Sequence, residues 1–159
     1  MSAEPPSRAL IRRWEKSAAA GDTNAQASLG AILATGDGVD ADEAGAVYWY
    51  AKAALQGDIT AKWNLATMIL NGEGISKNET YALRMIEDAA GEGQEDACRF
   101  LAYAYAEGKF GKAVDADESR RYEAKAEEIL CPTCAPTGAP VDIAKDLGVA
   151  LEKPVIQLL

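Results

Sequence analysis

Residues 25–57 read AQASLGAILATGDGVDADEAGAVYWYAKAALQG, and a second version of this segment occupies residues 61–93. The two segments align without a gap at a spacing of 36 residues, with Leu29 matched by Leu65 and Gly36 matched by Gly72. A fixed period of this length is the signature of a solenoid, in which stacked units bury their apolar faces against one another. The repeat therefore decides the fold, and it directs the search for function toward an extended binding surface.

Two weaker copies flank this pair. A third copy starts at Ala97; we expect three extra residues in its loop, so that it resumes at Asp117-Glu118 and places Arg121 where the repeat has alanine. A half copy precedes the first full repeat. We predict a repeat domain over residues 8–134 and a tail over residues 135–159. The units of that domain are a half repeat at 8–22 and full repeats at 23–58, 59–94 and 95–134.

Each unit is predicted to consist of two helices. In the first unit, helix A starts after Asp22 and stops at Gly36, and helix B starts after Asp42 and stops at Gly57. Aspartate caps the free N–H groups at a helix start, and glycine accepts the left-handed conformation at a helix end. Apolar residues recur at spacings of three and four, and never with a sustained period of two. The sequence thus predicts an all-α protein.

The string Ala-x-x-x-Leu-Gly…Gly-x-Gly-Val-x-x-Asp-x-x-x-Ala-x-x-Trp-Tyr-x-Lys-Ala-Ala-x-x-Gly, as it stands in residues 25–57, resembles the Sel-1-like repeat family, a relative of the tetratricopeptide repeats. The resemblance covers roughly residues 8–130. It implies a right-handed α/α superhelix and a role in protein–protein interaction, as an adaptor or scaffold, and many members are bacterial. The resemblance names no partner, because one fold serves many processes.

The chain is acidic, with 25 acidic and 16 basic residues, a net charge of −9 and no histidine among 159 residues. Such a chain repels phosphate groups, which argues against binding to nucleic acid or to an anionic membrane. The charge favours a basic partner through electrostatic steering, although solubility alone also explains it. The N-terminal residues are polar, and no apolar run approaches the length of a membrane span, so we expect a cytoplasmic protein.

Helix A of each unit is expected to line the concave face, so its outward positions form the candidate binding surface. Tyrosine, tryptophan and arginine, the residue types enriched at binding hot spots, gather on the second and third A helices. Alternatively, Trp63 and Phe100 pack between neighbouring repeats. The resemblance adds that an asparagine at position 64 holds the backbone of an extended peptide. The predicted partner-binding residues are Trp63, Asn64, Thr67, Arg99, Phe100 and Tyr103.

Cys131 and Cys134 form the only C-x-x-C motif. It follows the last predicted helix of an all-α chain, so the context of a thioredoxin-like redox site is missing. Zinc would need two further ligands, and Cys98 supplies one at most, so only a dimer sharing two pairs would close a metal site. Incidental thiols, a local disulfide and a shared metal site remain the alternatives. The acidic loop at 37–42 lacks the ligand order of a calcium loop.

The tail ends in apolar residues between Val149 and Leu159, interrupted by Pro154. An exposed apolar end is a liability, so the tail is expected to be covered. It caps the last repeat, folds into the concave groove, or pairs with another copy to form a homodimer. Capping is the most economical of the three, because the degraded third helix B leaves an unburied face.

The predicted function is a non-enzymatic adaptor without a cofactor, since histidine, the commonest general base, is absent and no nucleophile–base pair stands out. One alternative is an immunity or antitoxin protein that occludes a basic toxin, which the small size and acidic charge would suit. A second alternative is a small-molecule-binding or hydrolytic protein, implied by cysteine-rich relatives that bind penicillin-type ligands. The disulfide pattern of those relatives is absent here.

Overall fold

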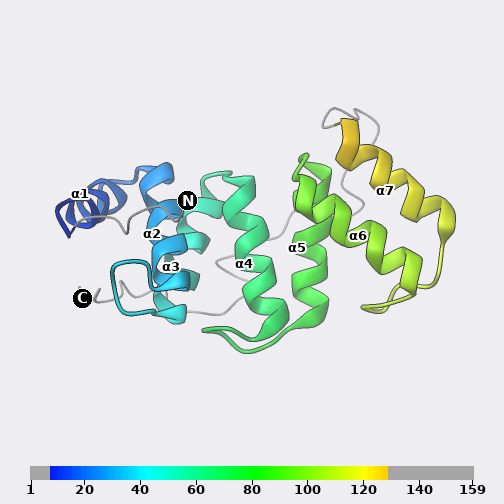
Figure 1. Ribbon diagram of the computed structural model, residues 1–159, viewed down its shortest axis with the longest axis horizontal. Coiled ribbons are helices and arrows are strands. Elements are labelled where there is room, and N and C mark those ends of the chain that lie inside the picture. The colour runs from blue at the N-terminus through cyan, green and yellow to red at the C-terminus, as the bar shows by residue number, and fades with distance from the viewer. Residues whose placement is uncertain (1–7, 129–159) are drawn as a thin grey trace.

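The computed structural model describes residues 8–128, which form seven α-helices and no β-strand. The helices follow one another along the long axis of the molecule (Figure 1). This arrangement confirms the predicted all-α helical solenoid. None of the helices in this part of the chain is long and apolar enough to cross a lipid bilayer. The helices are α1 (Arg8–Ala19), α2 (Thr23–Thr35), α3 (Glu43–Leu55), α4 (Ile59–Asn71), α5 (Glu79–Gly91), α6 (Glu95–Glu107) and α7 (Ala116–Glu128).

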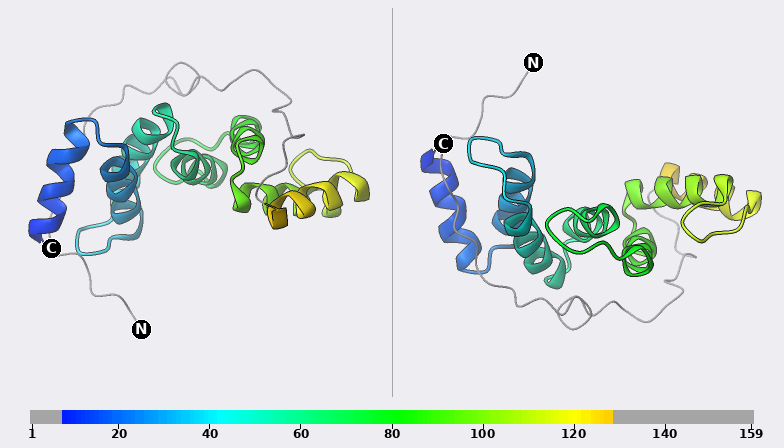
Figure 2. Two further views of the ribbon diagram at one scale, coloured as in Figure 1. Left: turned by 90° about the horizontal axis from the view of Figure 1, so that it is seen from above. Right: turned by 90° about the horizontal axis from the view of Figure 1, so that it is seen from below.

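Each helix packs against the next one along the chain, so that α2–α3, α4–α5 and α6–α7 form the three repeat units and α1 covers the first of them. In Figure 2 the green helices at the middle of the stack are seen end-on, whereas α1 and α7 lie across the view, so the helix axes rotate along the stack. Helix α2 also reaches past α3 to contact α4 directly. Helices on the inside of a curved row lie closest together, which places α2 and α4 on the inner side, and α6 is the equivalent helix of the third unit.

The helix ends follow from local sequence. Asp22 and Asp42 each accept a hydrogen bond, at 2.9 Å, from the backbone N–H three residues later, and so cap α2 and α3 as predicted. Gly36 and Gly72 end α2 and α4 in the left-handed conformation, with φ of 71° and 81°. A side-chain cap of this kind typically stabilises a helix by about 1 kcal/mol.

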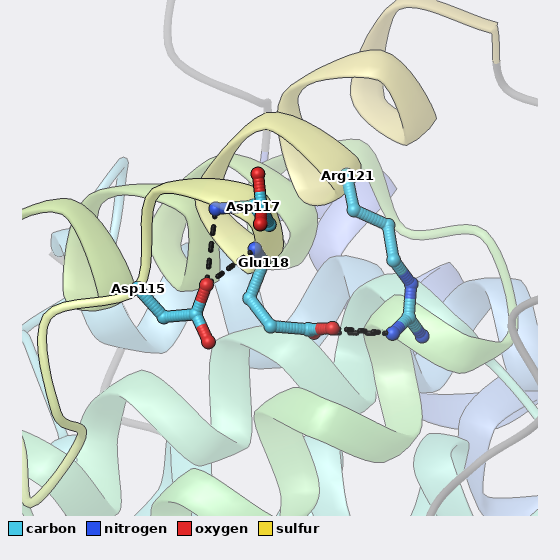
Figure 3. Close-up of polar contacts among 4 residues, drawn as sticks. All are labelled: Asp115, Asp117, Glu118 and Arg121. Atoms are coloured by element: carbon cyan, nitrogen blue, oxygen red, sulfur yellow. Dashed lines mark hydrogen bonds and ion pairs between the residues drawn. The ribbon is translucent and has the colours of Figure 1, made fainter.

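The third unit does not resume where the repeat count placed it. The Asp115 carboxylate accepts hydrogen bonds from the backbone N–H groups of Asp117 and Glu118, both at 3.0 Å, and thereby caps α7 (Figure 3). Asp115 is therefore the equivalent of Asp42. The loop from Gly108 to Asp115 spans seven positions against six from Gly36 to Asp42, so it contains one extra residue and not three.

This register changes which residues face the core. Ser119, and not Arg121, takes the alanine position of the repeat; Ser119 is buried, whereas Arg121 is exposed and pairs with Glu118 at 2.8 Å (Figure 3). Tyr122 takes the place of Trp49 and is also buried. The prediction for Arg121 was wrong because it counted from Asp117-Glu118, whereas the capping carboxylate lies two residues earlier.

The outward face of α7 is polar. The positions that α3 buries against α4 are occupied on α7 by exposed residues. A terminal repeat unit needs such a face to meet water, so α7 itself closes the described end of the stack. The unburied face that favoured a capping tail is thus largely polar, and capping by the tail stays a prediction. The tail at residues 135–159 lies outside the described residues, and so do the alternatives in which it fills the groove or forms a homodimer. Cys131 and Cys134 lie outside them as well. The buried set on α3 is Val47, Tyr50, Ala51 and Ala54, and the exposed set on α7 is Arg120, Glu123, Ala124 and Glu127.

Candidate partner-binding face

The six predicted contact residues lie on two of the inner helices, three on α4 and three on α6. We use the name inner face for the solvent-facing surface of α2, α4 and α6 on the inner side of the row. Two of the six residues touch across the helices: the rings of Trp63 on α4 and Phe100 on α6 lie edge to face, with centroids 6.0 Å apart. Both side chains are partly buried and pack against the core. Packing between neighbouring repeats therefore explains why part of each ring is buried.

A third ring, which is not among the predicted contact residues, completes this aromatic cluster. Phe110 lies 4.9 Å from Phe100 between centroids. It stands where the earlier units have Gly38 and Gly74, and it keeps the left-handed backbone of those glycines, with φ of 54°. Within residues 8–128 no other residue except glycine has a positive φ. This conformation is strained for a bulky side chain, and the ring contact with Phe100 helps to hold it.

Asn64 and Thr67 are engaged within the protein. A side-chain hydrogen bond joins Asn64 to the Tyr50 phenol on α3; burial raises the pKa of Tyr50 and outweighs the lowering by this bond. The Thr67 hydroxyl donates to the backbone carbonyl of Asn64 at 2.8 Å. An amide has two donors and an acceptor oxygen, so the Tyr50 contact leaves part of the Asn64 group for a ligand.

Arg99 and Tyr103 are the most accessible of the six residues. Arg99 pairs with Glu95 one turn earlier, at 2.6 Å, but both side chains are largely in solvent, where such a pair contributes little. Tyr103 is 48 % exposed. The Lys109 ammonium lies 4.7 Å from the centre of the Tyr103 ring and also bonds its hydroxyl. Neither Glu95 nor Lys109 was selected from the sequence.

Helix α2 continues the inner face with small, uncharged residues. Ser28 and Thr35 donate their hydroxyl hydrogens to carbonyl oxygens of their own helix, at 2.8 Å and 2.9 Å. No charged residue occurs anywhere in α2. Across the described residues, no group of three His, Cys, Asp or Glu side chains is placed to hold a metal ion. The chemistry available on this face is that of surface contact, by aromatic rings, hydrogen bonds and a few charges.

The sequence model of the Sel1 repeat matches residues 23–58, 59–93 and 95–127. The chain belongs to the Sel1 repeat family. Sel1 repeat proteins generally mediate protein–protein interaction.

Two solved Sel1 repeat structures resemble this one. A Sel1 repeat protein from Oxalobacter formigenes superposes with a TM-score of 0.69 and 27 % identity over 76 % of this chain. A protective antigen present in uropathogenic Escherichia coli strains, which displays an SLR fold, gives a TM-score of 0.68 and 33 % identity over 75 % of this chain. The aligned parts are 48 % and 25 % of those two proteins. No curated protein matches the chain.

Proposed function

We propose that this Sel1 repeat chain is an adaptor that binds a partner protein on its inner face, with Arg99 and Tyr103 as the principal contacts. The observation that carries the proposal is the exposure of a tyrosine and an arginine one helical turn apart on α6. Tyr103 is one of few large apolar side chains left exposed among residues 8–128. Tyrosine and arginine contribute disproportionately to binding energy, because they combine a large contact area with a polar group.

The aromatic cluster supports these contacts from below. The rings of Trp63, Phe100 and Phe110 join α4, α6 and the loop that follows α6. This packing fixes α6 relative to α4 before any partner arrives. A surface that is already ordered loses less conformational entropy on binding, so more of the contact energy appears as affinity.

The acidic groups on α6 indicate the charge of the partner at this end. Glu95, Asp96 and Glu107 all belong to α6 and reach the surface, alongside the single basic residue Arg99. With the net charge of −9, they attract a partner that carries basic side chains here. Such steering speeds association and weakens as salt is added.

Replacing Arg99 and Tyr103 together by alanine is expected to weaken partner binding by at least about 30-fold, because the loss of even one residue of these types at a hot spot costs about 2 kcal/mol. Both side chains are exposed, so the fold should be retained. The measurement is affinity capture from lysate of the source cells with the wild type and the Arg99→Ala/Tyr103→Ala variant, followed by titration of the captured protein.

The matched control replaces two exposed arginines on outer helices, Arg84→Ala/Arg120→Ala, and should bind as the wild type does. Trp63→Ala is a poorer probe, because it also removes the packing between α4 and α6. Equal affinity for the wild type and the Arg99→Ala/Tyr103→Ala variant would refute the proposal.

A further inference from the structure

A cavity of about 350 Å³ lies between α1 and α2, at the end of the inner face opposite to α6. Its walls include Arg13, Trp14 and Ser17 of α1 and Asn24 and Ser28 of α2. We propose that this cavity receives an acidic residue of the partner protein, with the carboxylate on Arg13 and the carbon stem against Trp14. The inference rests on the proposed adaptor function and adds the chemical character of the partner at this end.

The cavity exists because two residues of α1 and α2 do not contact each other, although the residues at the equivalent positions of the next repeat do. Trp14 is the equivalent of Tyr50, and Ser28 is the equivalent of Asn64. In the next seam along the stack, a side-chain hydrogen bond joins the Tyr50 phenol to the Asn64 amide. Here the Ser28 hydroxyl donates to Asn24 of its own helix at 2.8 Å, and the short side chain leaves the space beside Trp14 open.

The following seam has an aromatic ring at the same position. There Phe100 takes the position of Ser28 and Asn64, and its ring packs on Trp63 and Phe110. The first seam has a partly buried tryptophan, Trp14, beside a cavity. A volume of about 350 Å³ falls within the range of ligand-binding pockets.

The charge at this end of the molecule is positive. Helix α1 carries the basic residues Arg8, Arg12, Arg13 and Lys16 against the single acidic residue Glu15, and α2 carries no charge. Within the described residues Arg13 is exposed and forms no ion pair. A guanidinium group offers paired donors that match the two oxygens of a carboxylate. The indole of Trp14 supplies apolar area next to it.

One acidic group, Asp22, also borders the cavity. Its carboxylate accepts a hydrogen bond from the backbone N–H of Ala25 at 2.9 Å and caps α2. The positive end of the α2 dipole offsets part of its negative charge. Asp22 is therefore committed to the helix end, whereas Arg13 is available to a ligand.

Ser28 lines the cavity and also lies on the inner face, so the cavity and the inner face adjoin each other. A segment that lies along the inner face can therefore enter the cavity without leaving that face. The two ends of the face differ in charge, with basic groups on α1 and acidic groups on α6. A segment with an acidic residue at one end and basic residues at the other would bind in a single direction.

The test is a selection of displayed random peptides on the wild-type protein. The peptides recovered should be enriched in aspartate or glutamate, and synthetic copies should bind the Arg13→Glu variant at least about tenfold more weakly, as expected for a charge-assisted contact of about 1.5–3 kcal/mol. The matched control, Arg84→Glu, reverses a charge on the outer side and should leave their affinity unchanged. The indole N–H resonance of Trp14 should shift when the peptide is added, and circular dichroism verifies the fold of each variant.

Recovered peptides without acidic enrichment, or with equal affinity for the wild type and the Arg13→Glu variant, would overturn the inference. A selection that recovers no peptide would also overturn it, because the cavity is proposed to accept a linear segment. The recovered peptides could lose affinity for the Arg99→Ala/Tyr103→Ala variant and still bind the Arg13→Glu variant as they bind the wild type. That result would rule out the site for an acidic residue and leave the adaptor function standing. The capture experiment tests that function separately.

Discussion

Replacing Lys62 by methionine is expected to lower the free energy of unfolding by about 3 kcal/mol, the lower end of the cost of breaking a buried ion pair. Lys62 of α4 is only 8 % exposed. Its ammonium lies 2.8 Å from the Asp88 carboxylate and 2.5 Å from the Glu92 carboxylate of α5. Without the cation, the two carboxylates repel each other near the α4–α5 contact. Glu92 is 38 % exposed, so solvent screens its charge and reduces its contribution to the loss of stability.

The preceding repeat supplies a neutral version of the same contact. There Gln26 stands in the place of Lys62, and Gln56, in the place of Glu92, donates to it at 2.7 Å. The triple variant Lys62→Gln/Asp88→Asn/Glu92→Gln should therefore recover most of the lost stability. Urea unfolding of the three proteins measures the effect. A Lys62→Met protein as stable as the wild type would show that the triad contributes nothing.

The same triad predicts a pH dependence. Burial lowers the pKa of Lys62, but the hydrogen bonds and charges of Asp88 and Glu92 outweigh it, so the pKa in the folded protein lies above the usual lysine value. The stabilisation is fully present below the unfolded pKa of about 10.4 and is lost as the pH rises through the higher folded value. On the alkaline side, the stability difference between the wild type and the Lys62→Met protein should therefore shrink only at strongly alkaline pH. A loss of that difference at neutral pH would contradict this assignment.

The Gly74→Ala variant is expected to lose about 2–4 kcal/mol of stability, from the left-handed backbone and from overpacking together. Gly74 has a φ of 66°, and a Cβ atom there would lie 2.4 Å from the backbone carbonyl of Glu43 in α3. The Gly74 N–H also donates to the Glu43 carboxylate at 2.9 Å. Backbone atoms cannot rotate aside as a side chain can, so the loop of the second unit must move off the first.

Gly111 provides the matched control. Its φ is 70°, and no atom lies within 4 Å of the position of its Cβ, so Gly111→Ala should cost only the backbone term of about 1–2 kcal/mol. Thermal unfolding of both variants separates the two contributions. Equal losses at the two positions would mean that the contact between the Gly74 loop and α3 does not stabilise the stack.

The features that the sequence predicted correctly are those set by local patterns. The spacing of the repeat indicated the helix pairs. The caps at Asp22 and Asp42 and the left-handed Gly36 depend only on residues within one turn, so they could be read in order along the chain. The family resemblance, which rests on the same positions, was confirmed by the match over all three units.

The features that the sequence did not predict depend on contacts between units. The start of α7 at Asp115 was missed because Phe110 replaces the second loop glycine and hides the true loop length. The sequence did contain a sign of the changed loop, because residues 108–110 read Gly-x-Phe where residues 36–38 read Gly-x-Gly. The cavity beside Trp14 depends on how α1 packs against α2 around the short Ser28 side chain, which no sequence pattern specifies. The relative exposure of Trp63 and Tyr103 likewise follows from packing across α4 and α6.

Site-specific photo-crosslinking in the source cells tests the central claim, binding on the inner face, most directly. A photoreactive amino acid is placed at Tyr103 on α6 and, in a separate variant, at Arg84 on the outer helix α5; both positions are exposed. The account predicts that one partner protein is crosslinked from position 103 and is absent from position 84. Crosslinking of that protein from position 84 alone would contradict the account and move the binding surface to the outer helices.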